Sequence, residues 1–76
     1  MYDSSKIAEN IKITAIKKKV VIRNMLSDCG LGINTMSSLY HGNMIAVDSL
    51  AKIADYLEVS VDYLLGRTNE PKIHGA

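Results

Sequence analysis

Short side chains that can hydrogen bond to the edges of nucleic-acid bases are concentrated in one segment of this chain. The segment reads Asn34-Thr35-Met36-Ser37-Ser38-Leu39-Tyr40-His41-Gly42-Asn43. An asparagine amide can pair with adenine through two hydrogen bonds, and a threonine can offer a hydroxyl to a base edge and a methyl group to thymine. Serine hydroxyls and a further asparagine can reach a phosphate or a base. These residue types suit contact with DNA, provided that a rigid element presents them.

The residues around this segment predict two short helices joined by a tight turn. The first helix is expected to occupy about two turns and to end at Cys29-Gly30, because glycine adopts the left-handed conformation at little cost. Its apolar residues are Val20, Met25 and Leu26. Leu31 follows as an apolar turn residue, and the second helix is expected over residues 33–40, closed by Gly42. On this second helix Met36, Leu39 and Tyr40 share one face.

Two short helices with a glycine turn between them form the helix-turn-helix arrangement. Its second helix can enter a DNA major groove, about 12 Å wide, while the first lies across the backbone. The residues expected to read bases or to lie in the groove are Ile33, Asn34, Thr35, Ser37 and Ser38. Ile33 would do so by pressing on a thymine methyl group. The residues expected to contact phosphate are Lys17, Lys19, Arg23, His41 and Asn43.

Charge is unevenly distributed although the net charge is only +1. Six cations fall in the first third of the chain: Lys6, Lys12, Lys17, Lys18, Lys19 and Arg23. Four acids gather further on: Asp48, Asp55, Glu58 and Asp62. From charge alone the basic end is either a solvated helix face or an edge that faces phosphate. The three consecutive lysines can equally serve the dipole of the helix that they end.

Three further helices are predicted from apolar periodicity and capping residues. Ser4 and Ser5 are expected to cap a first helix that runs to Lys17-Lys18-Lys19. Its buried face is Ile7, Ala8, Ile11, Thr14 and Ala15. A fourth helix is expected from about 46 to 57. Its stripe is Val47, Leu50, Ile53, Ala54 and Leu57. A one-turn fifth helix is bounded by Ser60 and Gly66 and must lock onto the core through Tyr63 and Leu64.

No strand pattern is present, so the expected fold class is all-α with five helices. Seventy-six residues make one small domain. Residues 4–66 are expected to form it, and residues 67–76 to be a flexible tail, with no sensor domain after it. No apolar run reaches the roughly 18 residues of a membrane span, and no signal peptide is evident. A cytoplasmic protein without a membrane partner is therefore expected.

Enzymatic and metal chemistry find little support in the residue pattern. Cys29 is the single cysteine, which rules out an intramolecular disulfide. His41 and His74 lie far apart without the spacing of metal ligands. No nucleophile, base and orienting group can be assembled. We therefore expect no catalytic residue, no metal, no cofactor and no small-molecule ligand, and do not expect an enzyme.

The chain resembles the Cro and lambda-repressor type (XRE-like) helix-turn-helix family of phage and bacterial regulators. The resemblance covers about residues 6–68. Its most specific parts are Lys52-Ile53-Ala54-Asp55-Tyr56-Leu57 and Val59-Ser60-Val61-Asp62-Tyr63-Leu64-Leu65-Gly66-Arg67. Gly30, Leu31, the Asn34-Thr35-Met36-Ser37 run and Gly42 match more loosely. The resemblance implies a five-helix, lambda-repressor-like domain that binds a double-stranded operator sequence-specifically and regulates transcription. It further implies a repressor of prophage or mobile-element type, often a homodimer on a palindromic site.

Five positions depart from the family pattern, and one of them is Leu26, which stands where a small alanine is common. Val21 and Ile22 stand where a capping serine or threonine and a phosphate-contacting glutamine are typical, and Ile33 and Ser38 stand where glutamine, arginine or lysine is common. Ile22 and Ile33 motivate an alternative function: a helix-turn-helix protein-interaction module, such as an antirepressor or an antitoxin-like partner, with weakened DNA reading.

Overall fold

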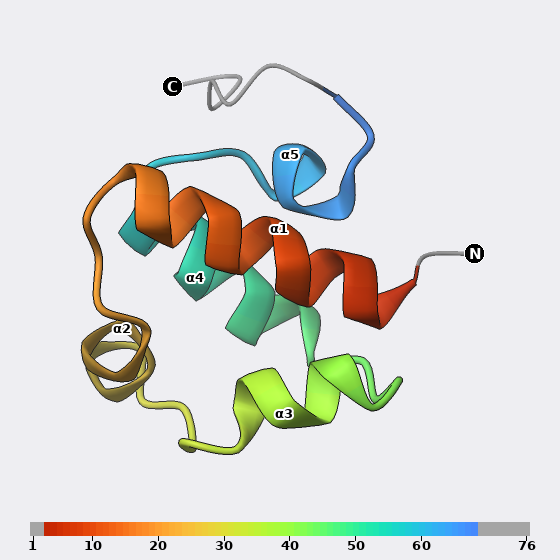
Figure 1. The fold of residues 1–76 in the computed structure, drawn as a ribbon, viewed down its shortest axis with the longest axis horizontal. Helices are drawn as coiled ribbons and strands as arrows, with labels where there is room; N and C mark the ends of the chain where they lie inside the picture. The colour runs from red at the N-terminus through yellow and green to blue at the C-terminus, as the bar shows by residue number, and fades with distance from the viewer. Residues whose placement is uncertain (1–2, 69–76) are drawn as a thin grey trace.

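The structure, a computed structural model, describes residues 3–68 and forms five α-helices within them, with no β-strand there. The helices are α1 (Ser4–Lys17), α2 (Ile22–Asp28), α3 (Thr35–Tyr40), α4 (Val47–Leu57) and α5 (Val61–Leu65). Figure 1 shows α1 crossing the middle of the molecule, with α5 on one side of it and α3 on the other, and α4 behind. The predicted all-α, five-helix fold is confirmed.

The first helix is capped by a different residue from the one expected. Asp3 is the N-cap of α1, and its Oδ1 accepts hydrogen bonds from the backbone amide of Ser5 at 3.0 Å and from the Ser5 hydroxyl at 2.7 Å. Ser4 is the first helical residue and is buried. The prediction of Ser4 and Ser5 as caps was therefore wrong. An aspartate one residue earlier can accept both bonds while the two serines enter the helix.

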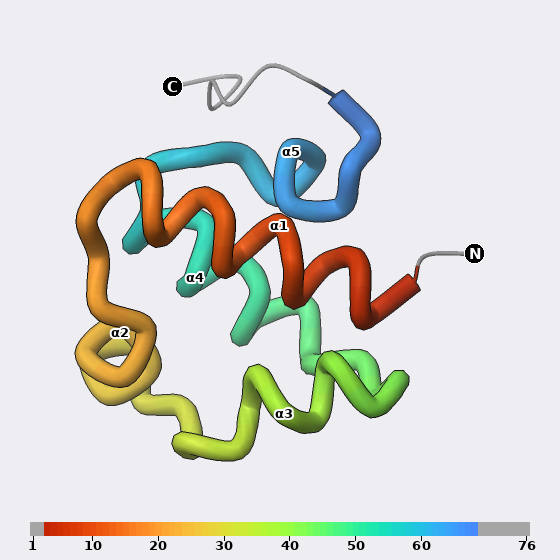
Figure 2. The backbone as a smooth tube through the Cα atoms, viewed as in Figure 1, coloured from red at the N-terminus to blue at the C-terminus, as the bar shows by residue number. Residues whose placement is uncertain are grey.

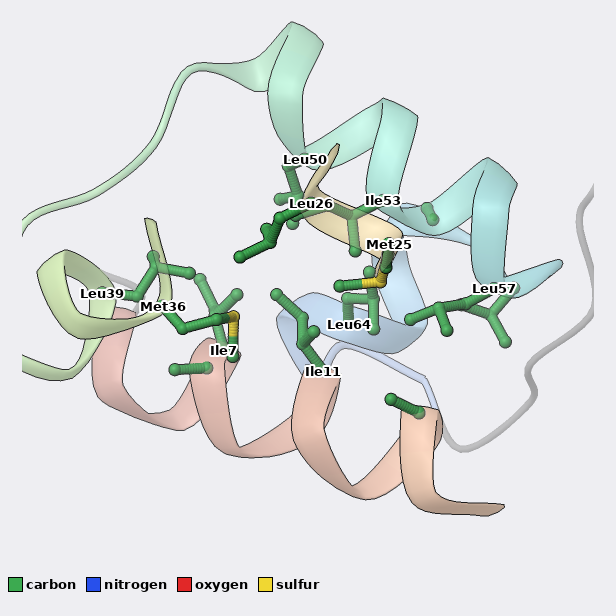
Figure 3. Close-up of a cluster of buried hydrophobic side chains, with 14 residues drawn as sticks. Ile7, Ile11, Met25, Leu26, Met36, Leu39, Leu50, Ile53, Leu57 and Leu64 are labelled. Carbon is green, nitrogen blue, oxygen red and sulfur yellow. The ribbon is translucent and has the colours of Figure 1, made fainter. Parts of the chain in front are cut away.

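A core shared by all five helices fixes their arrangement. Its largest fully buried side chains are Ile7, Ile11, Met25, Leu39, Ile53, Leu57, Val59 and Leu64. In Figure 3, Met36 and Leu39 of α3 lie beside Ile7 of α1, and Leu64 of α5 lies in the middle of the cluster. The three-four spacing expected on α1 is confirmed, since all five residues of its predicted buried face are buried. Their burial, at about 25 cal/mol per Å² of apolar surface, drives the packing.

The fourth helix buries four of its five predicted stripe residues: Leu50, Ile53, Ala54 and Leu57. Val47 is 77% exposed, so its place in the buried stripe was wrong. Val47 is the first residue of α4, and the helix enters the core only one turn later. Helical periodicity identifies the apolar face of a helix, but it does not show which residues along that face contact other helices.

The fifth helix is held at both ends and through its middle. The Ser60 hydroxyl accepts a hydrogen bond from the Tyr63 amide at 3.0 Å, and Gly66 ends the helix in the left-handed region at φ 82°, as predicted. Leu64 is fully buried and Tyr63 packs against the core. The side-chain amide of Asn10 in α1 donates a hydrogen bond of 3.0 Å to the carbonyl oxygen of Leu64. This bond joins α5 to α1. A single turn of helix is thus stable only as part of the core.

Beyond α5, the backbone amide of Arg67 donates to the Asp62 carbonyl at 2.9 Å, and the Arg67 guanidinium lies 3.8 Å from the Asp62 carboxylate. Residues 69–76, most of the predicted tail, lie outside the described part of the chain. The domain boundaries at 66 and 67 stay predictions. Among residues 3–68, no helix has the length and apolar character needed to cross a bilayer.

Candidate DNA-binding interface

The helix-turn-helix begins with α2, whose outward side is polar. Met25 and Leu26 are buried, Ile22 is partly buried against the core, and Arg23 and Asn24 are exposed. The N-cap residue Val21 makes no side-chain hydrogen bond to the first turn. Ile22 thus contributes to the core of the domain, and it provides little surface for a partner.

Two side-chain contacts fix the end of α2 against α4. The Tyr56 hydroxyl donates to Asp28 Oδ2 at 2.9 Å, and the Cys29 thiol donates to the Lys52 carbonyl oxygen at 3.6 Å. The hydrogen bond to Asp28 raises the pKa of Tyr56, and desolvation raises the pKa of Cys29. Cys29 is half-buried. The two contacts hold the first helix of the motif in place against α4.

The turn after α2 has the left-handed glycine that the sequence predicted. Gly30 has a φ of 72°, its amide donates to the Ser27 carbonyl at 3.0 Å, and the Leu31 amide donates to the Leu26 carbonyl at 2.8 Å. Leu31 then packs against the core. In Figure 2 the chain passes from α2, seen end-on, through this turn into α3, which runs across the view. The corner is therefore held by backbone hydrogen bonds and by the packing of a partly buried leucine against the core.

The third helix begins two residues later than predicted. Its first helical residue is Thr35, because the Thr35 amide and hydroxyl both donate to the Gly32 carbonyl oxygen, at 3.1 and 2.7 Å, and close a turn over residues 32–35. Ile33 and Asn34 consequently project from this turn, just before the helix. Sequence reasoning placed the Thr35 hydroxyl on a base, but its proton is already donated within the protein.

The five predicted base-reading residues fall into two groups. Ile33, Asn34 and Ser37 are exposed, and the exposed fraction of Ile33 reaches 68%. Thr35 and Ser38 are half-buried. Met36 and Leu39, on the opposite side of α3, are buried and hold the helix on α1. The exposed surface of the turn and of α3 thus carries an isoleucine, an amide, a hydroxyl and the Tyr40 ring, and no charge.

The five predicted phosphate-contacting residues, Lys17, Lys19, Arg23, His41 and Asn43, are all exposed. Three of them lie around the corner between α1 and α2, where Arg23 is part of α2, and the other two follow α3. Lys19 has a positive φ of 57°, a conformation that costs a lysine about 1 kcal/mol or more. The Asn43 amide donates to the Ser38 carbonyl at 2.9 Å, which fixes the backbone just after the helix.

Two features near the motif were missed by sequence reasoning. One is the Thr35–Gly32 hydrogen bond, which a threonine three residues after a turn glycine could have suggested. The other is exposed apolar surface after α3, at Met44 (50% exposed) and at Val47. Nothing in the spacing of these residues distinguishes them from core residues. Throughout residues 3–68, no three histidine, cysteine or acidic side chains come together where they could hold a metal ion.

A glycine-containing corner between two short packed helices, with the second helix exposing polar side chains, defines a helix-turn-helix DNA-binding domain. The family model of the Cro/C1-type HTH DNA-binding domain matches residues 10–70, so the chain belongs to this family. Comparison with curated proteins and with solved structures found no match. The family match confirms the resemblance drawn from residues 6–68 and gives the protein its coarse function, DNA binding.

Proposed function

We propose that this protein is a sequence-specific transcriptional regulator, a repressor of the prophage or mobile-element type, that inserts α3 into the major groove of an operator. The family supplies DNA binding. The observation that carries the finer proposal is the two-sidedness of α3: Met36 and Leu39 are buried, while Asn34 and Ser37 are exposed at the start and on the outer side of the helix. A helix held in this way presents its N-terminal residues to base edges.

The basic corner supports the proposal through phosphate contact. Lys17, Lys19 and Arg23 are exposed within a few residues of the start of α2, the helix that lies across the DNA backbone in this motif. Each phosphate neutralised releases counterions and contributes about −0.9 to the slope of log K against log salt. Three such contacts predict a slope of about −3 for each bound copy.

The direct test is binding of the full chain to fragments of its own upstream region and to a random fragment of equal length, over a series of salt concentrations. Preferential retention of the upstream fragment, weakening as salt rises, supports the proposal. No binding to any fragment at low salt would reject it. A reporter gene behind the bound fragment then shows whether occupancy lowers transcription.

Two variants separate reading from phosphate contact. Asn34→Ala should reduce the discrimination between bases at one base pair by about 1–3 kcal/mol. Lys17→Ala should instead weaken binding to all DNA sequences by a similar factor. Both side chains are exposed, so neither change removes a core contact. An equal loss on every sequence after Asn34→Ala would refute a reading role for Asn34.

Homodimerisation is part of the proposal because one module of this size reads few base pairs. In a dimer on a palindromic operator the two copies of α3 should lie about 34 Å apart, one turn of DNA. Half-sites with centres about 10 base pairs apart in the selected operator, together with sedimentation of the complex at two chains per site, are the expected results. A single half-site bound by one chain would refute the dimer.

The alternative, a protein-interaction module, is favoured by one observation: Ile33 is highly exposed beside the turn. Ile22, its second support, packs against the core instead. Capture of a stable protein partner, abolished by Ile33→Ser and accompanied by no DNA shift of the wild-type protein, would select this function.

A further inference from the structure

The exposed side of the turn and of α3 contains none of the side chains that usually read guanine. Arginine and lysine recognise guanine through its O6 and N7 atoms, the commonest specific contact to DNA. No arginine or lysine occurs between residues 24 and 51, so the turn, α3 and the loop after it contain none. Arg23, the nearest cation before this stretch, is the second residue of α2 and faces the backbone in the proposed binding mode.

We propose that the groove-facing residues of this protein recognise A·T base pairs, and that its operator half-sites carry adenine and thymine at the positions that Ile33 and Asn34 contact. This inference rests on the proposed function, since it assumes that α3 enters the major groove.

Asn34 has the chemistry and the freedom to read adenine. Its side chain is exposed, and although it occupies the N-cap position of α3, it makes no capping hydrogen bond. The amide oxygen can accept from adenine N6 while the amide nitrogen donates to N7, the pairing that asparagine makes with this base. Because no intramolecular cap has to be broken, the amide can form both bonds at no cost to the helix.

Ile33 favours thymine in the same groove and penalises guanine. It is 68% exposed and projects from the turn next to Asn34. The thymine methyl group is the only apolar group that the major groove presents, and an isoleucine can cover it. Against a G·C pair the same side chain would displace water from the O6 and N7 acceptors and from the cytosine amino group without replacing their hydrogen bonds, which is unfavourable.

Two further hydroxyl side chains, those of Ser37 and Thr35, do not change this preference. The Ser37 hydroxyl can donate to or accept from either type of base pair. Thr35 has already donated its hydroxyl proton to the Gly32 carbonyl, so it cannot donate to a base without breaking a 2.7 Å bond. Neither residue adds a determinant that would favour guanine.

The test is selection of bound sequences from a random DNA pool by the wild-type protein, followed by affinity measurements on base analogues in the selected site. We expect A·T pairs at adjacent positions of each half-site. Uracil in place of thymine removes only the methyl group, and 7-deazaadenine removes only N7. Each should weaken binding several-fold. The uracil effect should vanish in Ile33→Ala, and the deaza effect in Asn34→Ala.

Ile33→Arg is the gain-of-function arm, with Ile33→Val as its matched control. The arginine variant should shift the selected base at one position to guanine, while the valine variant keeps thymine. Enrichment of G·C half-sites by the wild-type protein would overturn the inference and leave the proposed function standing. Enrichment of A·T sequences without sensitivity to uracil or to 7-deazaadenine would also overturn it, because shape alone would then account for the preference. No enrichment of any sequence would count against the proposed function itself.

Discussion

The hydroxyl of Thr35 donates a 2.7 Å hydrogen bond to the carbonyl oxygen of Gly32, across the turn that leads into the third helix. The Thr35 amide donates to the same oxygen at 3.1 Å. One carbonyl therefore accepts two bonds from one residue, which sets the direction in which Ile33 and Asn34 leave the turn. We therefore predict that Thr35 affects DNA binding only as a positioning residue, through this bond.

Replacing Thr35 by valine should destabilise the domain by about 1 kcal/mol, the usual net contribution of such a hydrogen bond. Thr35→Ser keeps the hydroxyl and should retain most of the stability. Urea unfolding measures both. On DNA, Thr35→Val should weaken binding to the selected site more than Thr35→Ser does, without changing which base is preferred. A changed base preference would show that Thr35 itself reads DNA.

Lys19 and Glu58 form a matched pair for separating backbone strain from DNA contact. Both are in the left-handed region, with φ values of 57° and 59°. Glycine relieves the strain of this conformation, and this gain exceeds the extra conformational entropy that glycine loses on folding. Each substitution to glycine should therefore stabilise the protein by a net of about 0.5–1 kcal/mol. Thermal unfolding checks this.

Only one member of that pair should affect DNA binding. Lys19→Gly removes a cation beside α2 and should reduce the slope of log K against log salt by about 1. Glu58→Gly removes an acidic side chain at the end of α4, which is not among the predicted phosphate contacts, and should leave the slope unchanged. Equal slopes for Lys19→Gly and the wild-type protein would show that Lys19 contacts no phosphate.

Leu64 should be among the most sensitive positions in the chain, although its helix has a single turn. Its side chain is fully buried at the centre of the core, and leucine-to-alanine changes at such sites cost about 2–5 kcal/mol. A domain of this size has a small margin, so Leu64→Ala should be largely unfolded near 37 °C. Val47→Ala, at a 77% exposed site, should change stability by no more than about 0.5 kcal/mol. Circular dichroism melts compare the two.

The Asp3 cap should make stability depend on pH in the acid range. Hydrogen bonds from the Ser5 hydroxyl and then from the Ser5 amide lower the pKa of Asp3 from 3.8. The native state therefore prefers the ionised carboxylate, so the contribution is present above the unfolded pKa and is lost as pH falls through the lower folded value. Asp3→Ser keeps a capping oxygen without the titration. The wild-type protein should lose its advantage over Asp3→Ser below about pH 4, in urea unfolding at a series of pH values.

The sequence by itself determined the number and order of the helices and most of their ends, because these depend on local chemistry. Ser60 and Gly66 bound α5 as predicted, since a hydroxyl cap and a left-handed glycine act within a few residues of chain. Periodicity likewise identified the buried faces of α1 and α4. The polar residues that follow the Gly30 turn led to the proposal that this segment meets DNA.

The tertiary structure alone decided what each of those residues is free to do. Val47 fits the stripe of α4 but lies beyond the core, and Ile22, which looked like an exposed isoleucine, packs against it. Thr35 and Asn34 have similar reading chemistry in the sequence. In the fold the hydroxyl of Thr35 is bonded to Gly32 and the amide of Asn34 makes no such bond. Burial and hydrogen-bond partners depend on how distant segments pack, and spacing along one helix does not contain that information.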